Sequence, residues 1–467
     1  MIKNSLLVIG GNCVQLLSKI IIWLVIPGIL GVTEYGYYKT YTLYLVYAMF
    51  LHFGFPDGIL LLYAGNGYDD LEKEKFRMYS KFLAIFLGAI SGVGFLVSFF
   101  FLEGIKQFIF CVLCIDAFFV NYATYFKFIS QAVMRFKELT TRNIIDAILK
   151  VISVVILFNL DRVGIIKFDT KTYVASLVII DLFILVWYIG QYWGMIFGET
   201  EEIKFYKVKI IFKTGIVLTI SAQVSGLIFN LDRQLVSLLF DVNIYSYYSF
   251  AYSIVNMISV TVGVVSTVIF PNIKRVSIEH AMKEYSGLMQ NISEVVFLLL
   301  AGYYPIIFIV KKFLPLYEPA LEYIKIIFPG VAISCCISIV IFTYYKALRK
   351  LKLYLKIACA ILVIGLGLNI CGYFILQSPI VFSIASVFTM LIWYLLAEQY
   401  LISKYKIAWK TNYFYVLAMM VWFYITSNMI KNIFVGMAVY ILGYSIILII
   451  KKARWLNKYF CSSLKNK

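Results

Sequence analysis

Long apolar runs recur along the whole chain and predict membrane-spanning helices. Each run is about 20 residues long and returns about every 30 residues, the length that a helix needs to cross a bilayer. Apolar and polar residues do not alternate with a period of two, which argues against a transmembrane β-barrel. The pattern predicts fourteen helices, at residues 5–30, 41–64, 82–102, 105–126, 143–159, 172–197, 214–240, 244–270, 288–310, 323–345, 353–376, 379–402, 411–430 and 432–450.

Two similar segments indicate an internal repeat. "LGVTEYGYYKTYTLYLV" begins at Leu30 and "FDVNIYSYYSFAYSIV" begins at Phe240, an offset of 210 residues, and each is expected in the outer loop between the first two helices of its half. Since the offset spans six helices, it preserves orientation and predicts two parallel six-helix repeats, an arrangement common in transporters. The predicted organisation is an N-terminal lobe at 1–200, a C-terminal lobe at 201–405, an added helix pair at 406–452 and a basic cytoplasmic tail at 453–467.

Composition supports an all-α integral membrane protein. Of the 467 residues, 62% are hydrophobic and 14% are charged, whereas soluble domains average about 25% charged residues. The first apolar run begins near the N-terminus without a small-residue cleavage site, so we interpret it as a retained helix and not as a signal peptide. The connections are all short, which leaves no room for an inserted soluble domain.

The formal net charge of +18 is explained by membrane topology. If the N-terminus is cytoplasmic, 30 Lys and Arg residues fall on the inner side and 9 on the outer side. This asymmetry follows the positive-inside rule and places both termini in the cytoplasm. Anionic membrane lipid accounts for the attraction of the basic loops, so no nucleic-acid partner is expected.

The sequence lacks the motifs of soluble enzymes. None of the 28 glycines is followed by lysine, so there is no P-loop, and neither G-x-S-x-G nor H-E-x-x-H occurs. The chain has only 2 histidines, and its 8 cysteines are interpreted as packing residues. We therefore expect no enzyme activity, no metal and no cofactor.

Charged residues at membrane depth are the candidate functional residues. An ionised side chain near a helix centre costs about 2.5–3.5 kcal/mol on insertion scales and normally faces protein or a water-filled cavity. Under the repeat offset Arg233 falls opposite Trp23, one helical turn from Lys19 on the same face. Lys19 and Arg233, with Asp232 beside the latter, therefore predict a shared cationic chamber that binds a diphosphate.

A purely structural interpretation stands beside this one. Arg233 would then pair with Asp116 or Asp181 of a neighbouring helix to fix packing. Asp146 and Lys150, four residues apart, are expected to form a local ion pair.

Two further features are candidates for a switch and a gate. His52, in the second predicted helix, is a candidate protonation switch, with a satisfied core histidine as the alternative. Pro27 and Gly28 lie near the outer end of the first predicted helix, where a break is tolerated beside a cavity. Bending there is the expected gate.

The motifs resemble a known family. "LDRQLVSLLFDVNIYSYYSFAYSI" and "VIFPNIKR" are similar to the polysaccharide-transport (Wzx-type, O-antigen) branch of the multidrug/oligosaccharidyl-lipid/polysaccharide (MOP) exporter superfamily. The matching positions are Asp232 and Arg233, then Tyr247, Tyr248 and Ala251, then Pro271, Ile273 and Arg275. Ser246 departs from the usual glycine. The basic stretch "YYKALRKLKLYLK" also resembles that branch's inner loop after the tenth helix.

The resemblance implies a MATE-like, V-shaped bundle of two six-helix lobes with a cationic central cavity. It implies a flippase that moves undecaprenyl-diphosphate-linked oligosaccharides to the outer leaflet of the bacterial inner membrane, for O-antigen, capsule or exopolysaccharide. H⁺ or Na⁺ would drive alternating access, with Asp57, Asp116 and Asp181 as coupling candidates. A polymerase and a chain-length regulator of the same pathway would be partners. The alternatives are a lipid II flippase, a multidrug or cation exporter of the same superfamily, and a membrane glycan polymerase.

Overall fold

Two helical units make up the chain, residues 1–249 and residues 250–467. The computed structural model describes residues 2–202, 204–254, 257, 273, 277–405, 407 and 411–465, and no strand occurs among them. Eleven of the described helices are long and apolar enough to cross a membrane. The prediction of an all-α, multi-pass membrane protein is confirmed, whereas Pro271 and Arg275 of the third motif lie outside the described residues.

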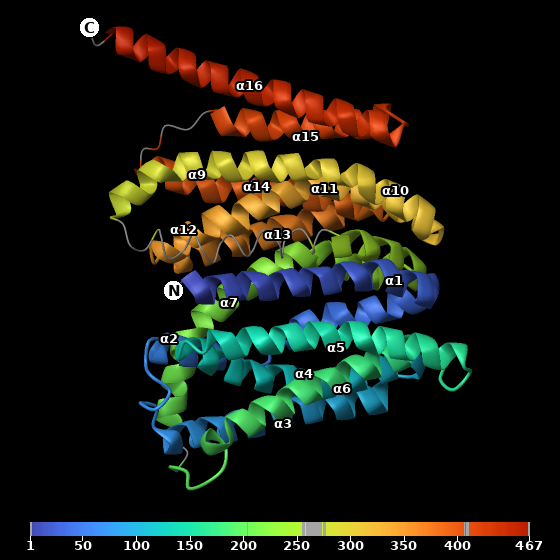
Figure 1. The fold of residues 1–467 in the computed structure, drawn as a ribbon, viewed down its shortest axis with the longest axis vertical. Helices are drawn as coiled ribbons and strands as arrows, with labels where there is room; N and C mark the ends of the chain where they lie inside the picture. Colours follow the sequence, from blue (N-terminus) through green and yellow to red (C-terminus); the bar gives the residue numbers. More distant parts are fainter. Residues whose placement is uncertain are drawn as a thin grey trace. The chain divides into compact units, whose positions relative to one another are not determined.

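The first unit is a bundle in which α1 packs on α5, α3 on α4, and α6 on both α4 and α5 (Figure 1). Its helices are α1 (Ile2–Ala48), α2 (Phe55–Tyr63), α3 (Lys73–Phe101), α4 (Gly104–Ala132), α5 (Phe136–Arg162), α6 (Thr170–Gln191) and α7 (Phe205–Leu239), with a 3₁₀ turn η1 (Trp193–Met195) after α6. A further helix begins at residue 242.

The first two predicted spans meet at a single glycine. Gly31 has φ 71° and ψ −178° inside α1, a conformation that only glycine adopts without strain. Residues 32–40 are helical, so the prediction of an outer loop there was wrong. The kink lies four residues after Pro27, which itself stays inside the helix.

The second predicted span, 41–64, is broken. Residues 49–54 form turns between α1 and α2, with Phe53 at φ 46° and Gly54 at φ 86°. Apolar periodicity did not reveal this break because the turn residues are themselves mostly apolar. His52 lies in the turn and is 5% exposed, and its Nδ1 accepts a 3.0 Å hydrogen bond from the Gly54 N–H.

Glycines allow α2 to lie directly against α7. A Cβ atom at Gly215 would stand 2.0 Å from the Gly54 carbonyl oxygen, and one at Gly58 would stand 2.2 Å from the Ile211 carbonyl oxygen. Thr219 Oγ1 donates a 2.7 Å hydrogen bond to Asp57 Oδ2 across the same contact. The coupling candidate Asp57 therefore joins the two helices at their closest approach.

In the second unit, α11 packs against α9 and α14, and α13 packs against α14. The elements are α9 (Ile278–Leu299), η2 (Leu300–Gly302), α10 (Tyr303–Phe313), η3 (Pro315–Tyr317), α11 (Ala320–Cys336), a π-helical turn η4 (Ile337–Ile341), α12 (Phe342–Ala347), α13 (Leu351–Leu376), α14 (Ile380–Tyr405), α15 (Thr411–Met429) and α16 (Ile433–Lys465).

The last two helices, α15 and α16, run side by side (Figure 1), and both contact α9. Tyr440 Oη of α16 donates a 2.6 Å hydrogen bond to the Phe297 carbonyl oxygen, and Lys451 Nζ lies 2.9 Å from Glu294 Oε1. The helix α16 continues to Lys465, through most of the segment expected as a cytoplasmic tail.

The α2–α7 contact yields the first testable prediction. Gly215→Val places side-chain carbons where the α2 backbone lies, so the free energy of unfolding should fall by about 1–3 kcal/mol. The apparent melting temperature of the detergent-solubilised chain measures this loss. Gly92→Ala is the control, because a Cβ there has nothing within 4 Å; equal melting of the two variants would contradict the close approach.

Candidate functional site

A polar cavity of about 440 Å³ lies within the first unit, bounded by α1, α4, α5 and α6. Four basic side chains line the cavity: Lys19, Lys127, Arg142 and Lys150. Two acidic side chains, Asp146 and Asp181, lie among them. The cavity therefore carries more positive than negative formal charge.

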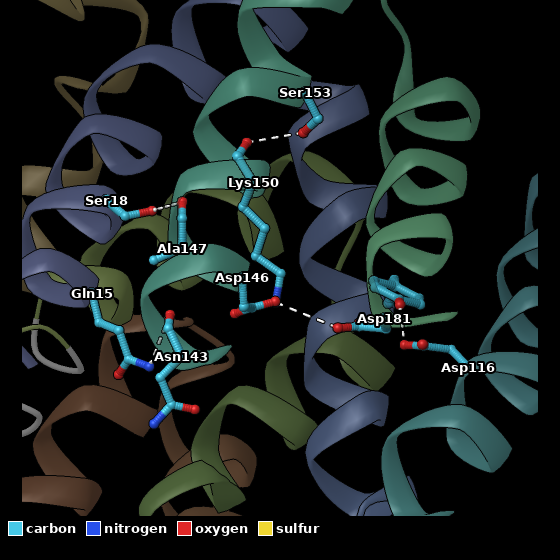
Figure 2. Close-up of polar contacts among 10 residues, drawn as sticks. Gln15, Ser18, Asp116, Asn143, Asp146, Ala147, Lys150, Ser153 and Asp181 are labelled. Carbon is cyan, nitrogen blue, oxygen red and sulfur yellow. Dashed lines mark hydrogen bonds and ion pairs between the residues drawn. The ribbon is translucent and has the colours of Figure 1, made fainter. Parts of the chain in front are cut away.

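The helix α5 supplies one wall. Arg142, Asp146 and Lys150 follow at intervals of four residues and so lie on one helical face. The Ser18 hydroxyl of α1 donates a 2.9 Å hydrogen bond to the Ala147 carbonyl oxygen, which holds α1 against this wall (Figure 2). Lys19, the next residue of α1, is thereby kept at the cavity.

Lys150 is shared between two carboxylates. Its Nζ lies 2.8 Å from Asp146 Oδ1 and 3.6 Å from Asp181 Oδ1 (Figure 2). The predicted ion pair between Asp146 and Lys150 is confirmed. Asp181, a coupling candidate, is thus tied to α5 by Lys150 and not by Arg233.

Asp116 extends this network into the protein. It is fully buried, and Tyr41 Oη donates a 2.5 Å hydrogen bond to its Oδ2. Figure 2 shows the Asp116 and Asp181 side chains next to one another. A polar chain therefore runs from Lys150 through the two acids to Tyr41 of α1.

The other three cations have no carboxylate partner among the described residues. Arg142 is 2% exposed, and its guanidinium carbon lies 3.8 Å from the centroid of the Tyr188 ring. Its Nε and Nη1 atoms are buried without a hydrogen-bond partner in the described part of the chain. Lys19 and Lys127 line the same cavity and form no ion pair with any described residue. The cavity thus contains three cations whose charge no described carboxylate neutralises.

Asp232 and Arg233 lie elsewhere in the first unit. Asp232 Oδ2 accepts a 2.8 Å hydrogen bond from Tyr248 Oη, and Arg233 Nη1 donates a 3.0 Å hydrogen bond to Asn230 Oδ1. Both residues are buried, and neither lines the cavity that holds Lys19. The structure thus brings Lys19 together with Asp181, but gives Arg233 different neighbours.

Sequence reasoning missed Lys127 and Arg142 because it placed both in an inner loop. The helix α4 runs to Ala132 and α5 begins at Phe136, so both cations lie inside helices. A basic residue near the end of an apolar run gives no signal that separates a loop from a helix end.

The two repeated segments contact each other directly. Thr33 Oγ1 donates a 2.7 Å hydrogen bond to Asn243 Oδ1, and these residues are 210 positions apart, the offset of the repeat. Tyr245 Oη donates a 3.0 Å hydrogen bond to the Lys39 carbonyl oxygen. A Cβ atom at Gly36 would stand 2.5 Å from the Val242 carbonyl oxygen. Contact between equivalent positions is what a pseudo-two-fold axis produces.

The fold is that of a MOP-type transporter. A lipid II flippase MurJ in an inward closed conformation is similar over 98% of this chain and 100% of that chain, with a TM-score of 0.70 and 15% identity. An inward-facing multidrug resistance MATE family transporter covers 85% and 95% with a TM-score of 0.58 and 12% identity. A mutant of the Vibrio cholerae MATE transporter VcmN covers 88% and 98%, also with a TM-score of 0.58 and 12% identity.

The sequence itself identifies the family within that class. The model of the family described as polysaccharide biosynthesis protein matches residues 1–277. The chain therefore belongs to the polysaccharide biosynthesis protein family, within the MOP exporter superfamily. None of the curated proteins matches the sequence significantly.

The shared lysine gives a prediction about stability. Lys150→Met leaves Asp146 and Asp181 without their cation, and should lower the free energy of unfolding by about 1–3 kcal/mol because the groups are only partly exposed. Adding Asp146→Asn should recover part of the loss, as read by thermal melting in detergent. If Lys150→Met melts like the parent chain, these ion pairs do not stabilise the unit.

Proposed function

We propose that this transporter is a flippase for undecaprenyl-diphosphate-linked oligosaccharides in the bacterial cytoplasmic membrane. The observation that carries the proposal is the cavity of the first unit, where Lys19, Lys127 and Arg142 face a polar space without carboxylate partners among the described residues. The family and the fold support a transporter, and the positive charge of the cavity supports a substrate with an anionic headgroup.

A diphosphate suits this cavity better than other headgroups. Guanidinium and ammonium groups donate charge-assisted hydrogen bonds to phosphate oxygens, and arginine can do so with two donors at once. Nε and Nη1 of Arg142 are the buried donors without a partner in the described part of the cavity wall. An organic cation, the substrate expected of a drug exporter, would meet four basic and two acidic side chains there, so the charge balance disfavours that alternative.

The position of the cations agrees with loading from the cytoplasm. The turn between α4 and α5 faces the cytoplasm in the topology that the positive-inside rule gives. Lys127 is five residues from the end of α4 and Arg142 is six residues from the start of α5, which places them about 7.5–9 Å along the helices from the turn. A headgroup in the inner leaflet therefore reaches these side chains before it reaches the bend of α1.

The contact between the repeat copies is the proposed outer gate. Alternating access requires that one side be closed while the other is open, and the packing of Gly36 on Val242 leaves no space between the two backbones. The hydrogen bond between Thr33 and Asn243 spans the same contact. Pro27 and Gly28 precede this gate in α1 and remain the proposed place of bending, next to the observed kink at Gly31.

The chain of acids beside the cavity is the proposed coupling path for H⁺ or Na⁺. Asp181 contacts Lys150, and Asp116 accepts from Tyr41 in the half of α1 that carries the gate. Loading or unloading of an ion at these acids would therefore act on both the cationic wall and α1. His52 and Asp57 are coupling candidates outside the cavity, at the break before α2 and at the α2–α7 contact.

Arg142 provides the direct test of the substrate. Arg142→Gln removes the charge and should reduce flipping by roughly 10–100-fold, the effect of about 1.5–3 kcal/mol for a hydrogen bond to a charged group. In cells that lack their own copy of the gene, lipid-linked units should accumulate on the cytoplasmic side at unchanged protein abundance.

The matched control is Arg162→Gln, at the exposed C-terminal end of the same helix. It should support normal surface polysaccharide. Normal flipping by Arg142→Gln, or equal losses in both variants, would contradict a diphosphate site in this cavity.

The gate is tested by a reversible lock. In the Thr33→Cys/Asn243→Cys double variant, oxidation should join the two repeat copies and stop flipping, and dithiothreitol should restore it. The single variants, treated in the same way, show whether native cysteines contribute. Full flipping by the oxidised and cross-linked protein would show that the two segments do not separate during transport.

A further inference from the structure

A second pocket lies in the first unit, beside the contact between the two repeat copies. It has a volume of about 370 Å³ and is lined by the second half of α1, the start of α4, the end of α7 and residues 240–242 and 245. This volume is within the range of small-ligand sites. None of the charged residues of the diphosphate cavity lines it.

Aromatic rings form much of its wall. Tyr37, Tyr44, Phe110 and Tyr245 line the pocket. Tyr44 and Phe110 pack edge to face at 4.8 Å, the Tyr44 hydroxyl accepts a 2.9 Å hydrogen bond from Gln234, and the Tyr245 hydroxyl is bound to α1. Three of the rings are thus held in place, as a preformed binding surface requires.

Tyr37 differs from the other three rings. It is only half-buried, and the described residues give its hydroxyl no hydrogen-bond partner. Its ring and its hydroxyl are therefore both available to a ligand in the pocket.

The pocket contains one charge of each sign. Lys106 makes no ion pair with any described residue. Asp241 Oδ1 accepts hydrogen bonds from the N–H groups of Asn243 at 2.8 Å and Ile244 at 3.1 Å, which leaves Oδ2 for a ligand. Polar hydroxyls of Thr40 and Ser237 complete the lining.

The aromatic rings and the two opposite charges of the pocket favour one class of ligand over others. Both charged side chains are exposed at the edge of the pocket, so an anion there would meet Asp241 and a cation would meet Lys106. A neutral molecule with many hydroxyl groups satisfies both, because a carboxylate accepts from hydroxyls and an ammonium donates to them. Its apolar ring face can lie on an aromatic ring.

We propose that this pocket is a saccharide subsite that binds one neutral or N-acetylated pyranose, stacked on Tyr37 and hydrogen-bonded by Asp241 and Lys106. As a subsite for the transported glycan, it rests on the proposed function. Tyr44 of the pocket lies near the end of α1, and Met49 of the diphosphate cavity lies five residues later, in the turn that follows this helix. Both sites are lined in part by α1.

The location also links sugar binding to the gate. One side of the pocket belongs to the first repeat copy, with Tyr37 and Thr40, and another belongs to the second copy, with Val242 and Tyr245. Separation of the copies changes the pocket, so occupancy by a sugar favours one state of the gate. Binding of the glycan at this subsite, and not only binding of the diphosphate, therefore affects opening and closing of the gate.

Saturation-transfer NMR on the full chain in lipid nanodiscs tests the subsite. The probes are the methyl glycosides of glucose, galactose and N-acetylglucosamine, added one at a time. At least one should receive saturation on its ring protons. Tyr37→Ala should weaken its binding about five-fold or more through loss of stacking, whereas Tyr37→Phe should retain most of it.

Asp241→Asn is the second variant. Asparagine caps a helix as well as aspartate does, so the fold is kept while the carboxylate is lost, and binding should again fall. Tyr206→Ala, at an exposed tyrosine outside the pocket, is the control. No transfer to any of the three glycosides, or equal signals from Tyr37→Ala and Tyr206→Ala, would overturn the subsite.

Pyrophosphate binding, measured on the same samples by ³¹P NMR, separates this proposal from the proposed function. Glycoside binding without pyrophosphate binding would leave the sugar pocket standing and reject the diphosphate cavity, and the reverse would reject the pocket alone. Undecaprenyl-diphosphate-linked N-acetylglucosamine should displace the glycoside that binds. If it does not, the pocket takes free sugars and is no part of the transport path.

Discussion

The arrangement of the first unit depends on the free-energy cost of keeping positive charge inside a membrane bundle. A buried cation is tolerated when it has a carboxylate, a hydrated cavity or an anionic ligand. Lys150 has two carboxylates, but Lys19, Lys127 and Arg142 face the cavity without one among the described residues. The excess of positive charge makes the space suitable for an anion, and Arg142 presents buried donors that an anion would satisfy.

The rest of the first unit arranges helices around that charge. The three-residue turn after α4 brings Lys127 and Arg142 to one end of the cavity, and the bond from Ser18 to α5 brings Lys19 to the same space. At the kink at Gly31, α1 turns back on itself (Figure 1). The first half carries Lys19 of the cavity, and the second half carries Gly36 at the contact with the second repeat copy and Tyr41 beside Asp116. The proposed substrate site, coupling path and gate therefore all include residues of α1.

Much of the fold could be read from the sequence, because membrane thickness fixes the length of apolar runs and the offset of 210 residues recurs in the Thr33–Asn243 contact. The Asp146–Lys150 pair followed from helical spacing alone. Local breaks did not follow, since Phe53 and Gly54 adopt left-handed conformations inside an apolar run. The neighbours of Arg233 and the inclusion of Lys127 and Arg142 in the cavity depend on how helices pack, which single-sequence periodicity does not encode. The lobe boundary at 200 remains a prediction, although α7 packs with the first unit.

The most direct test is an experimental structure of the full chain with undecaprenyl diphosphate, determined by cryo-electron microscopy in lipid nanodiscs. We expect density for the two phosphates within hydrogen-bond distance of Arg142 and at least one of Lys19 and Lys127. A diphosphate bound at another place, with Arg142 still facing an empty cavity, would contradict this expectation.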